Sequence, residues 1–214
     1  MKALLSILLL LLISVNGFSQ IDNEYWGSVS FEKKIIKKTR LNLNLGYRIE
    51  NIAENNSKFI QFGVKRKLPF KLKLEVGYRF TNKENYKREF RYTHRQFINL
   101  AKGFKIKKFK FTFRTKFQWE FKNQLSSKKT DLQDFVLRNK LKVARKIFKR
   151  TYVFGASELY SFNTALLFEK YRFAGGIKYG VTKKIDLSLM SMYEAEVHDD
   201  GEAWIVGLSY SHKL

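Results

Sequence analysis

Three histidines are the residues of this chain best suited to acid–base catalysis, and His94 is the first to consider. A hydrolytic triad needs a serine and a carboxylate within hydrogen-bond reach of its histidine. No serine-containing motif pairs with His94 by spacing, and its near neighbours include Arg91 and Arg95. We therefore expect His94 to be a polar lumen or rim residue, and we predict no catalytic residue in the chain.

A dense group of oxygen donors close to the C-terminal end is the candidate metal site. Hard oxygen ligands of this kind suit Ca²⁺ or Mg²⁺. Their spacing matches no metal-binding loop signature, so we predict a solvated acidic loop, with no metal and no other cofactor. The group consists of Glu194, Glu196, His198, Asp199, Asp200 and Glu202.

The elements that would position such residues begin after an export signal. A short basic start precedes a run over residues 3–15 that is almost entirely leucine and isoleucine. That order, followed by small residues, is typical of a secretory signal peptide cleaved between Ser19 and Gln20. The sequence thus predicts a signal peptide over residues 1–19 and one mature domain over residues 20–214.

The composition of the chain favours a β-protein in a membrane. The sequence has no cysteine, a single proline at Pro69 and a formal net charge of +23. An exported domain without disulfides needs another source of stability, which a closed hydrogen-bonded barrel in lipid supplies. Because central strands exclude proline, its near absence suits a chain made mostly of strand. An exported basic protein is expected to meet anionic lipid or lipopolysaccharide rather than nucleic acid.

Alternation of period two marks the strands, and it is clearest over residues 108–122. Apolar residues fill one face of this run and mostly charged residues fill the other. The run is too long for an ordinary globular strand, whereas a tilted membrane strand of about 9–11 residues with extensions into water explains it. The face predicted to contact lipid carries Phe109, Phe111, Phe113, Phe117, Trp119 and Phe121.

Strand-like runs of this kind follow one another along the whole mature chain. The connections between them alternate in length, as in outer-membrane barrels with short periplasmic turns and longer outer loops. Because bacterial single-chain barrels have even strand numbers, we predict an all-β antiparallel transmembrane barrel of about 12 strands, with 10 as the alternative. The runs are residues 25–34, 39–50, 58–67, 71–80, 90–101, 108–122, 134–145, 151–160, 170–180, 184–196 and 202–213.

The same alternation places many basic side chains on the inward face, because they would be costly if they faced lipid. Few inward carboxylates, namely Glu50, Glu75 and Glu120, offset their charge. The pattern predicts either a plugged, cross-linked interior or a small anion-preferring pore. The predicted lumen-lining cations are Arg48, Arg79, Lys110, Arg114, Lys116, Arg138, Lys140, Arg172 and Lys178.

The end of the chain carries a pattern related to membrane assembly. Tyr210, His212 and Leu214 lie on one face of the final strand-like run. They resemble the C-terminal recognition signal of outer-membrane proteins, which alternates apolar or aromatic residues up to the chain end. We therefore predict that these residues serve the outer-membrane assembly machinery rather than any activity.

An internal repeat and the two chain ends together resemble a known family. The sequence LNLNLGYR over residues 41–48 is repeated as LKLEVGYR over residues 72–79, and Tyr25-Trp26 stand just after the signal peptide. With the C-terminal strand, these features resemble the outer-membrane proteins grouped as domain of unknown function 2490, over essentially the whole mature chain. The resemblance implies a barrel fold and an outer-membrane location. It implies no activity and supplies no catalytic residue.

Three functions follow from these patterns. The preferred one is an integral outer-membrane barrel without enzymatic activity, serving envelope structure or as a small anion-preferring pore. The alternatives are an outer-membrane enzyme acting on lipid or lipopolysaccharide, and a secreted soluble β-protein that binds polyanions. The expected partners are membrane lipid, lipopolysaccharide, the outer-membrane assembly machinery and small anions, with no nucleic acid.

Overall fold

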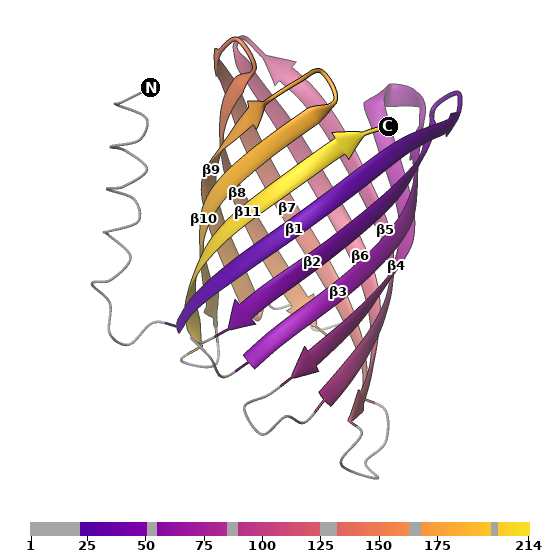
Figure 1. The fold of residues 1–214 in the computed structure, drawn as a ribbon, viewed down its shortest axis with the longest axis vertical. Coiled ribbons are helices and arrows are strands. Elements are labelled where there is room, and N and C mark those ends of the chain that lie inside the picture. The colour runs from indigo at the N-terminus through magenta and orange to yellow at the C-terminus, as the bar shows by residue number, and fades with distance from the viewer. Residues whose placement is uncertain (1–21, 51–54, 85–89, 125–131, 163–167, 198–200) are drawn as a thin grey trace.

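The chain folds as a closed β-barrel (Figure 1). The computed structural model describes residues 22–50, 55–84, 90–124, 132–162, 168–197 and 201–214, and within these ranges the barrel has eleven strands. The all-β barrel predicted from the alternation is confirmed. The predicted signal peptide lies outside the described residues. Among the described residues, no helix has the length and apolar character needed to cross a membrane.

The strands correspond one to one with the eleven runs predicted from the sequence, and most of them extend further at one or both ends. A single turn of 3-10 helix, η2 (Pro69–Lys71), interrupts the connection between the third and fourth strands. The strands are β1 (Asp22–Ile36), β2 (Thr39–Glu50), β3 (Asn55–Lys67), β4 (Leu72–Glu84), β5 (Phe90–Ile106), β6 (Phe109–Gln124), β7 (Leu132–Phe148), β8 (Thr151–Phe162), β9 (Lys170–Gly180), β10 (Ile185–Glu196) and β11 (Glu202–Lys213).

The strand number differs from the predicted 12 or 10, and the difference lies in how the barrel closes. Neighbouring strands are antiparallel except β1 and β11, which run parallel from Asp22 opposite Ala203 to Glu32 opposite Lys213. In a chain of consecutive hairpins, an odd number of strands leaves the first and last strands pointing the same way. Closure therefore needs one parallel pair, which the even-number rule did not anticipate.

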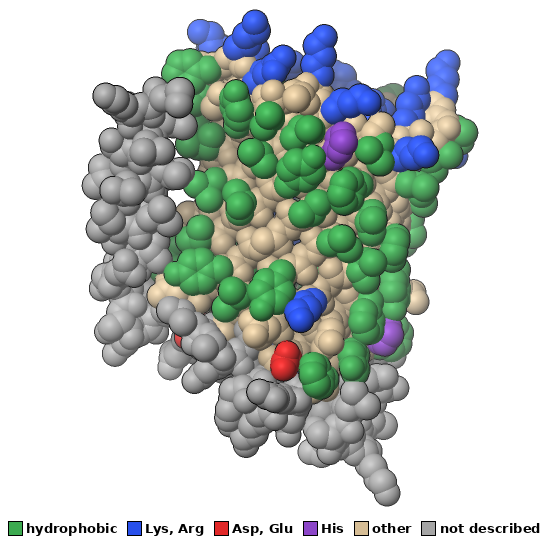
Figure 2. Space-filling view, viewed as in Figure 1, with side chains coloured by type: hydrophobic (Ala, Val, Ile, Leu, Met, Phe, Trp, Pro, Cys, Tyr) green, Lys and Arg blue, Asp and Glu red, His purple; other side chains and the backbone are tan. Residues whose placement is uncertain are grey.

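The register of the strand pairs decides which side chains share a face. Residues directly opposite each other point to the same side of a sheet, and one such row links Trp26, Arg48 and Ser57 across β1, β2 and β3. The other set carries apolar side chains on the outside, among them Phe62 and Phe113, which are 52% and 48% exposed. Figure 2 shows apolar side chains spread over the outer wall. Outer-membrane barrels present such a band to lipid and turn their polar side chains inward.

The two ends of the barrel differ in their connections and charge. Two-residue turns join β1 to β2, β5 to β6 and β7 to β8 at one end, which we call the short-turn end. Lys38, Lys107 and Arg150 in these turns have φ angles of 71°, 51° and 98°. Lysine and arginine side chains gather at this end, which is uppermost in Figure 2. The strand ends on either side of the longer connections, such as the end of β2 and the start of β3, lie at the opposite end (Figure 1).

Candidate functional site

The barrel interior is the candidate functional site because the inward faces of the strands bring the polar and charged side chains together. Several inward side chains halfway along the strands are almost inaccessible to water. Phe97 of β5 and Gln118 of β6 are 1% exposed, Glu158 of β8 is 3% exposed, and Ile205 of β11 is 0% exposed. An open aqueous channel would leave such inward side chains wet, so the middle of the lumen is filled by side chains.

Arginine and aromatic side chains alternate across one half of this filled region. The guanidinium of Arg79 lies 4.1 Å from the ring centre of Phe59. Arg48 faces the same ring at 5.4 Å and lies 4.0 Å from the ring of Trp26. A guanidinium over an aromatic face gains cation–π attraction, which strengthens where water is excluded. These contacts join β4, β3, β2 and β1 through side chains alone.

The alternation continues across the lumen to the far wall. Arg172 of β9 lies 5.4 Å from the ring of Trp26 and 4.7 Å from the ring of Tyr160. The series ends at Arg138 of β7, whose guanidinium lies 4.4 Å from the centre of the Tyr160 ring. Because Trp26 belongs to β1 and Arg172 to β9, the contact bypasses β10 and β11. We call the whole series the arginine–aromatic ladder: Arg79, Phe59, Arg48, Trp26, Arg172, Tyr160 and Arg138.

Glu158 neutralises the cationic side chains at one end of the ladder. Its Oε1 lies 2.8 Å from Nη2 of Arg138, and its Oε2 lies 3.2 Å from Nζ of Lys140. Arg114 forms a third ion pair with the same carboxylate. Arg138 also donates a hydrogen bond of 3.0 Å from Nη1 to Oε1 of Gln118. One buried carboxylate thus holds three cations that come from β6 and β7.

The opposite end of the ladder has fewer carboxylates. Arg79 donates hydrogen bonds of 3.0 and 2.7 Å from Nε and Nη2 to Oε1 of Gln61, which is neutral. Within the described ranges, no carboxylate lies at ion-pair distance from Arg48 or Arg79. Arg172, by contrast, pairs with Glu194. The lumen therefore keeps a surplus of positive charge on the β2–β4 side, held mainly by aromatic faces and amides.

The Gly-Tyr-Arg repeat explains how aromatic rings fit inside so narrow a barrel. Gly46 lies directly opposite Phe59, and Gly77 lies directly opposite Phe97, in each case on the inward face. A Cβ atom on Gly77 would lie 2.5 Å from Cζ of Phe97, and one on Gly46 would overlap the ring of Phe59. Each glycine therefore leaves the space that a neighbouring phenylalanine ring occupies, a pairing that also steadies a strand glycine.

A third pair of this kind lies on the other side of the barrel, and two of the three rings also carry a lysine. Gly176 is directly opposite Phe154, whose Cζ would lie 2.8 Å from an added Cβ. Lys142 lies 3.7 Å from the ring centre of Phe154. Lys116, which is 7% exposed, lies 3.9 Å from the ring of Phe97. The recurring unit of this lumen is thus a glycine, an opposing phenylalanine and a cation on that ring.

Gly77→Ala should lower the free energy of unfolding by about 1–3 kcal/mol, the usual range for overpacking a closely packed interior. The added methyl group would lie 2.4 Å from the backbone carbonyl oxygen of Phe62 and 2.5 Å from Cζ of Phe97, which is almost fully buried. Gly103→Ala on the same inward face is the matched control, because its Cβ would meet its nearest atom, the carbonyl oxygen of Phe111, at an ordinary 3.7 Å. Urea unfolding in lipid vesicles measures both variants. Equal stability of the two would refute the space-filling role assigned to Gly77.

The structure places all nine predicted lumen cations on the inward faces of their strands. It brings Arg48, Arg79, Arg138 and Arg172 together in the ladder. Arg114, Lys116 and Lys140 contact Glu158 or Phe97 beside it. Lys178 instead pairs with Asp186 nearer the short-turn end, at 3.0 Å.

The sequence analysis missed the inward aromatic residues and Arg95, whose Nε lies 2.7 Å from Oε1 of Glu120. No aromatic residue was predicted to face the lumen, whereas Trp26, Phe59 and Tyr160 point inward. A usable signal existed in the repeat, because an inward glycine next to an outward tyrosine indicates that something large needs the space.

The other two candidate sites do not assemble chemistry in the described residues. His94 points outward, with its Nδ1 2.5 Å from the hydroxyl oxygen of Tyr78 and its ring 5.2 Å from that of Phe80. Glu194 and Glu196 both pair with Lys170, at 2.7 and 2.6 Å.

No group of three metal-binding side chains occurs in the part of the chain that the structure describes. Of the other members of the acidic group, Glu202 is the first residue of β11, and His198, Asp199 and Asp200 lie outside that part.

The predicted assembly residues lie on the outer face near the short-turn end. Tyr210 and His212 stack edge to face with ring centres 6.3 Å apart, and His212 also meets Phe31 of β1 across the parallel seam. The backbone N–H of Leu214 donates to the carbonyl oxygen of Glu32 at 2.8 Å. These residues therefore help to join the last strand to the first, and their role in assembly stays a prediction.

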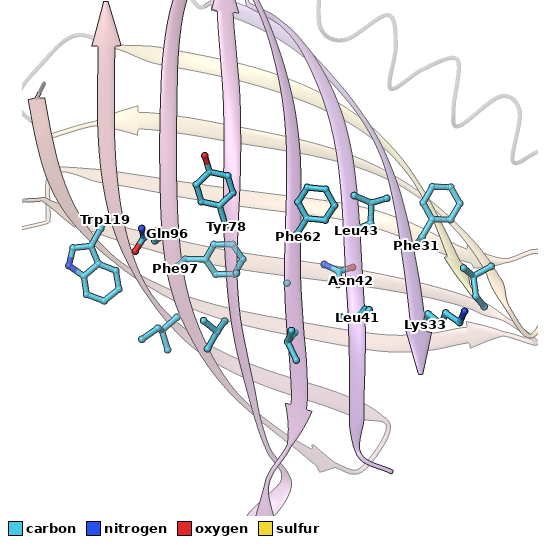
Figure 3. A pocket seen from close by; sticks show the side chains of 16 residues that line it. Phe31, Lys33, Leu41, Asn42, Leu43, Phe62, Tyr78, Gln96, Phe97 and Trp119 are labelled. Carbon is cyan, nitrogen blue, oxygen red and sulfur yellow. The ribbon is translucent and has the colours of Figure 1, made fainter. Parts of the chain in front are cut away.

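A hollow of about 830 Å³ on the outer wall belongs to the lipid-facing surface (Figure 3). Its lining includes Leu41, Phe62, Tyr78 and Trp119, and Lys33 is its single charged lining residue. The hollow lies between outward side chains of neighbouring strands from β1 to β6. Gly63 of β3 and Gly77 of β4, which are directly opposite each other, also line it. A surface of this character suits lipid acyl chains and offers little for catalysis.

Solved structures share the barrel fold of this chain. The β-domain of the Bordetella autotransporter BrkA is similar with a TM-score of 0.54 and 10% identity, over 80% of this chain and 82% of that one. LpxR from Salmonella typhimurium is similar with a TM-score of 0.51 and 10% identity, over 82% of this chain and 83% of that one. At such identities the likeness shows the fold alone, which is that of outer-membrane β-barrels.

A comparison with curated proteins finds no match. A match to a protein family does cover most of the barrel, from residue 23 near the start of β1 to residue 204 in β11. This agrees with the family that the Gly-Tyr-Arg strands and the chain ends resemble. The chain belongs to the family described as protein of unknown function (DUF2490).

Proposed function

We propose that this outer-membrane barrel is a non-enzymatic envelope protein whose lumen is closed at its middle. The observation that carries the proposal is the burial of inward side chains from β5, β6, β8 and β11, which include Phe97, Gln118, Glu158 and Ile205. A conducting barrel needs a continuous water path, whereas inward residues with 0–3% exposure are packed against other side chains. The arginine–aromatic ladder supports the same reading, because it links opposite walls through direct side-chain contacts.

The non-enzymatic part of the proposal has separate support. Hydrolytic chemistry needs a nucleophile and a base close together and reachable by substrate. His94 faces outward among aromatic side chains, and Glu158, the buried carboxylate beside the ladder, is held by arginine and lysine. Lipid or lipopolysaccharide is thus expected as the surrounding medium of this barrel rather than as its substrate.

A small anion-preferring pore is the second candidate function. It is favoured by the surplus of positive charge in the lumen, where Arg48, Arg79 and Lys116 lack ion-pair partners among the described residues. Confined like charges raise one another's energy and attract small anions. Such a pore would require the ladder to move aside.

Planar-bilayer recording on the refolded protein distinguishes the two candidates. We expect silent membranes from the wild type, because the ladder fills the lumen. The double variant Trp26→Ala and Phe59→Ala removes two aromatic members of the ladder and is expected to give anion-selective current steps. The control Phe62→Ala and Trp119→Ala removes two outward aromatic residues and should stay silent.

Anion-selective steps from the wild type would overturn the closed lumen and support the pore. Cation-selective steps would contradict both candidates, since the lumen is basic. Heat-modifiable gel mobility of every variant confirms that the barrel has folded before it is recorded.

A further inference from the structure

A second cavity lies inside the barrel at the short-turn end and shares no lining residue with the arginine–aromatic ladder. Its volume is about 470 Å³, which is within the range of small-molecule sites. We call it the short-turn vestibule. Its basic inward lining consists of Lys34, Arg40, Lys65, Lys67 and Lys73, which come from β1, β2, β3 and β4.

The strand register brings these cations directly opposite one another. Lys34 is opposite Arg40, and Arg40 is in turn opposite Lys65. Lys67 is opposite Lys73 in the next inward row. Like charges in directly opposed positions destabilise a sheet. Three such pairs concentrate positive charge in one cavity, at whose open end Lys34, Lys67 and Lys73 are exposed.

The carboxylates of the vestibule are too few to offset these charges. Glu32 is held by Arg40 at 3.1 Å and by Lys65 at 2.7 Å. Glu75 lies 3.9 Å from Nζ of Lys65 and accepts a hydrogen bond of 3.0 Å from the side-chain amide of Asn99. Both carboxylates are thus directed to the same side of the cavity, where Lys65 stands between them.

Three lysines of the vestibule are left for another partner. Within the described residues, Lys34, Lys67 and Lys73 form no ion pair with a carboxylate. The ammonium group of Lys73 is repelled by those of Lys110, Lys67 and Lys65 and is attracted by the carboxylate of Glu32, with which it forms no ion pair. Their amines therefore present a cluster of charge-assisted hydrogen-bond donors that no described acceptor satisfies.

A strained turn residue adds to the same cluster. Lys38 lines the vestibule and holds a left-handed backbone with φ of 71°. A left-handed backbone disfavours non-glycine residues, and Lys107 and Arg150 hold it in the other two-residue turns as well. The turn places one more cationic side chain at the mouth of the cavity.

We propose that the short-turn vestibule binds an anion carrying two or more phosphate groups. Phosphate oxygens accept several charge-assisted hydrogen bonds at once, and lysine binds them as a point charge. The cavity has room for more than one phosphate group. The short turns of outer-membrane barrels lie on the periplasmic side, so the ligand would enter from the periplasm. It is either a free oligophosphate or the phosphate groups of a lipid headgroup at the barrel rim. The proposal does not depend on whether the lumen conducts.

Pyrophosphate titration tests the site on the full-length barrel folded in phosphatidylcholine nanodiscs. We expect saturable binding by calorimetry, measured against sodium chloride of matched ionic strength. Lys67→Gln with Lys73→Gln should weaken the affinity about tenfold or more, because each lost charge-assisted hydrogen bond contributes more than a kilocalorie per mole. The matched control, Lys183→Gln with Lys184→Gln, removes the same charge from the turn between β9 and β10 and should leave the affinity unchanged.

Nanodiscs that also contain phosphatidylglycerol identify the source of the phosphate. If pyrophosphate binding disappears in them for the wild type, lipid headgroups occupy the vestibule. If it persists, the ligand is a free anion, and either result supports the site. No binding above the chloride control in phosphatidylcholine overturns the proposal. Equal weakening by the two double variants overturns it as well, since it would mean attraction to net charge alone.

Discussion

Glu158→Gln should lower the free energy of unfolding of the barrel by about 3–5 kcal/mol, the range found when one member of a buried ion cluster is removed. Glutamine keeps the shape of the side chain but removes the charge that Arg114, Arg138 and Lys140 share. Glu158 itself is 3% exposed, so water cannot replace the lost interaction without opening the lumen. Three neighbouring cations would then be left buried with no carboxylate between them.

Reversible urea unfolding in lipid vesicles, followed by tryptophan fluorescence, measures the effect. Glu84→Gln is the matched control. Glu84 is the last residue of β4, lies on the outward face of that strand and forms no ion pair with the described residues. Its stability should stay within about 0.5 kcal/mol of the wild type. A Glu158→Gln barrel as stable as this control would mean that anions or water already screen the cluster, and the filled lumen would have to be abandoned.

Phe113→Lys is the second change with a large expected effect. Phe113 is the fifth of the sixteen residues of β6, faces outward and is 48% exposed in the isolated barrel. A lysine at the bilayer midplane costs about 2–4 kcal/mol in a membrane strand, so we expect that loss of stability or a block in assembly. Folding yield and urea unfolding in bilayers measure it.

The depth dependence of this effect provides its control. Phe109 has the same outward orientation but stands at the first position of β6, beside the short turn. Phe109→Lys should cost only about 0–1 kcal/mol, because a lysine near the interface reaches water. Normal folding and stability of Phe113→Lys would contradict a membrane-spanning β6. Equal losses at the two positions would argue for a packing defect rather than a lipid environment.

The strands and their lipid-facing sides were predictable because both depend on local sequence. Alternation of period two is a property of neighbouring residues, and lipid forbids exceptions over long stretches. The run containing Phe113 therefore predicted β6 to within one or two residues at each end. The inward direction of Arg48 and Arg79 followed from the same alternation, without knowledge of any partner.

The contents of the lumen were not predictable in the same way. Trp26 and Arg172 meet across the barrel although they are far apart in the sequence and on strands that do not pair. Such a contact depends on barrel diameter and strand stagger, which no single strand encodes. Inward aromatic residues such as Tyr160 also look the same in the sequence as the lipid-facing ones. The closed ladder thus emerges only when all eleven strands are in register.

The strand number was mispredicted because the rule of even strand numbers was preferred to the eleven alternating runs in the sequence. Eleven alternating runs were present in the sequence, and eleven strands are present in the described structure. The rule of even numbers applies when the first and last strands pair antiparallel. Here the pairing of Asp22 with Ala203 begins a parallel seam, and the rule does not hold.

The parallel seam makes the path of the chain through the membrane one-way. Eleven strands form five hairpins and one further strand, and each hairpin returns the chain to the side from which it came. The additional strand does not, so β1 starts at one face of the bilayer and β11 finishes at the other (Figure 1). During insertion ten strands can enter the bilayer as complete hairpins. The remaining strand must cross on its own, and the polar end that crosses first must pass through lipid.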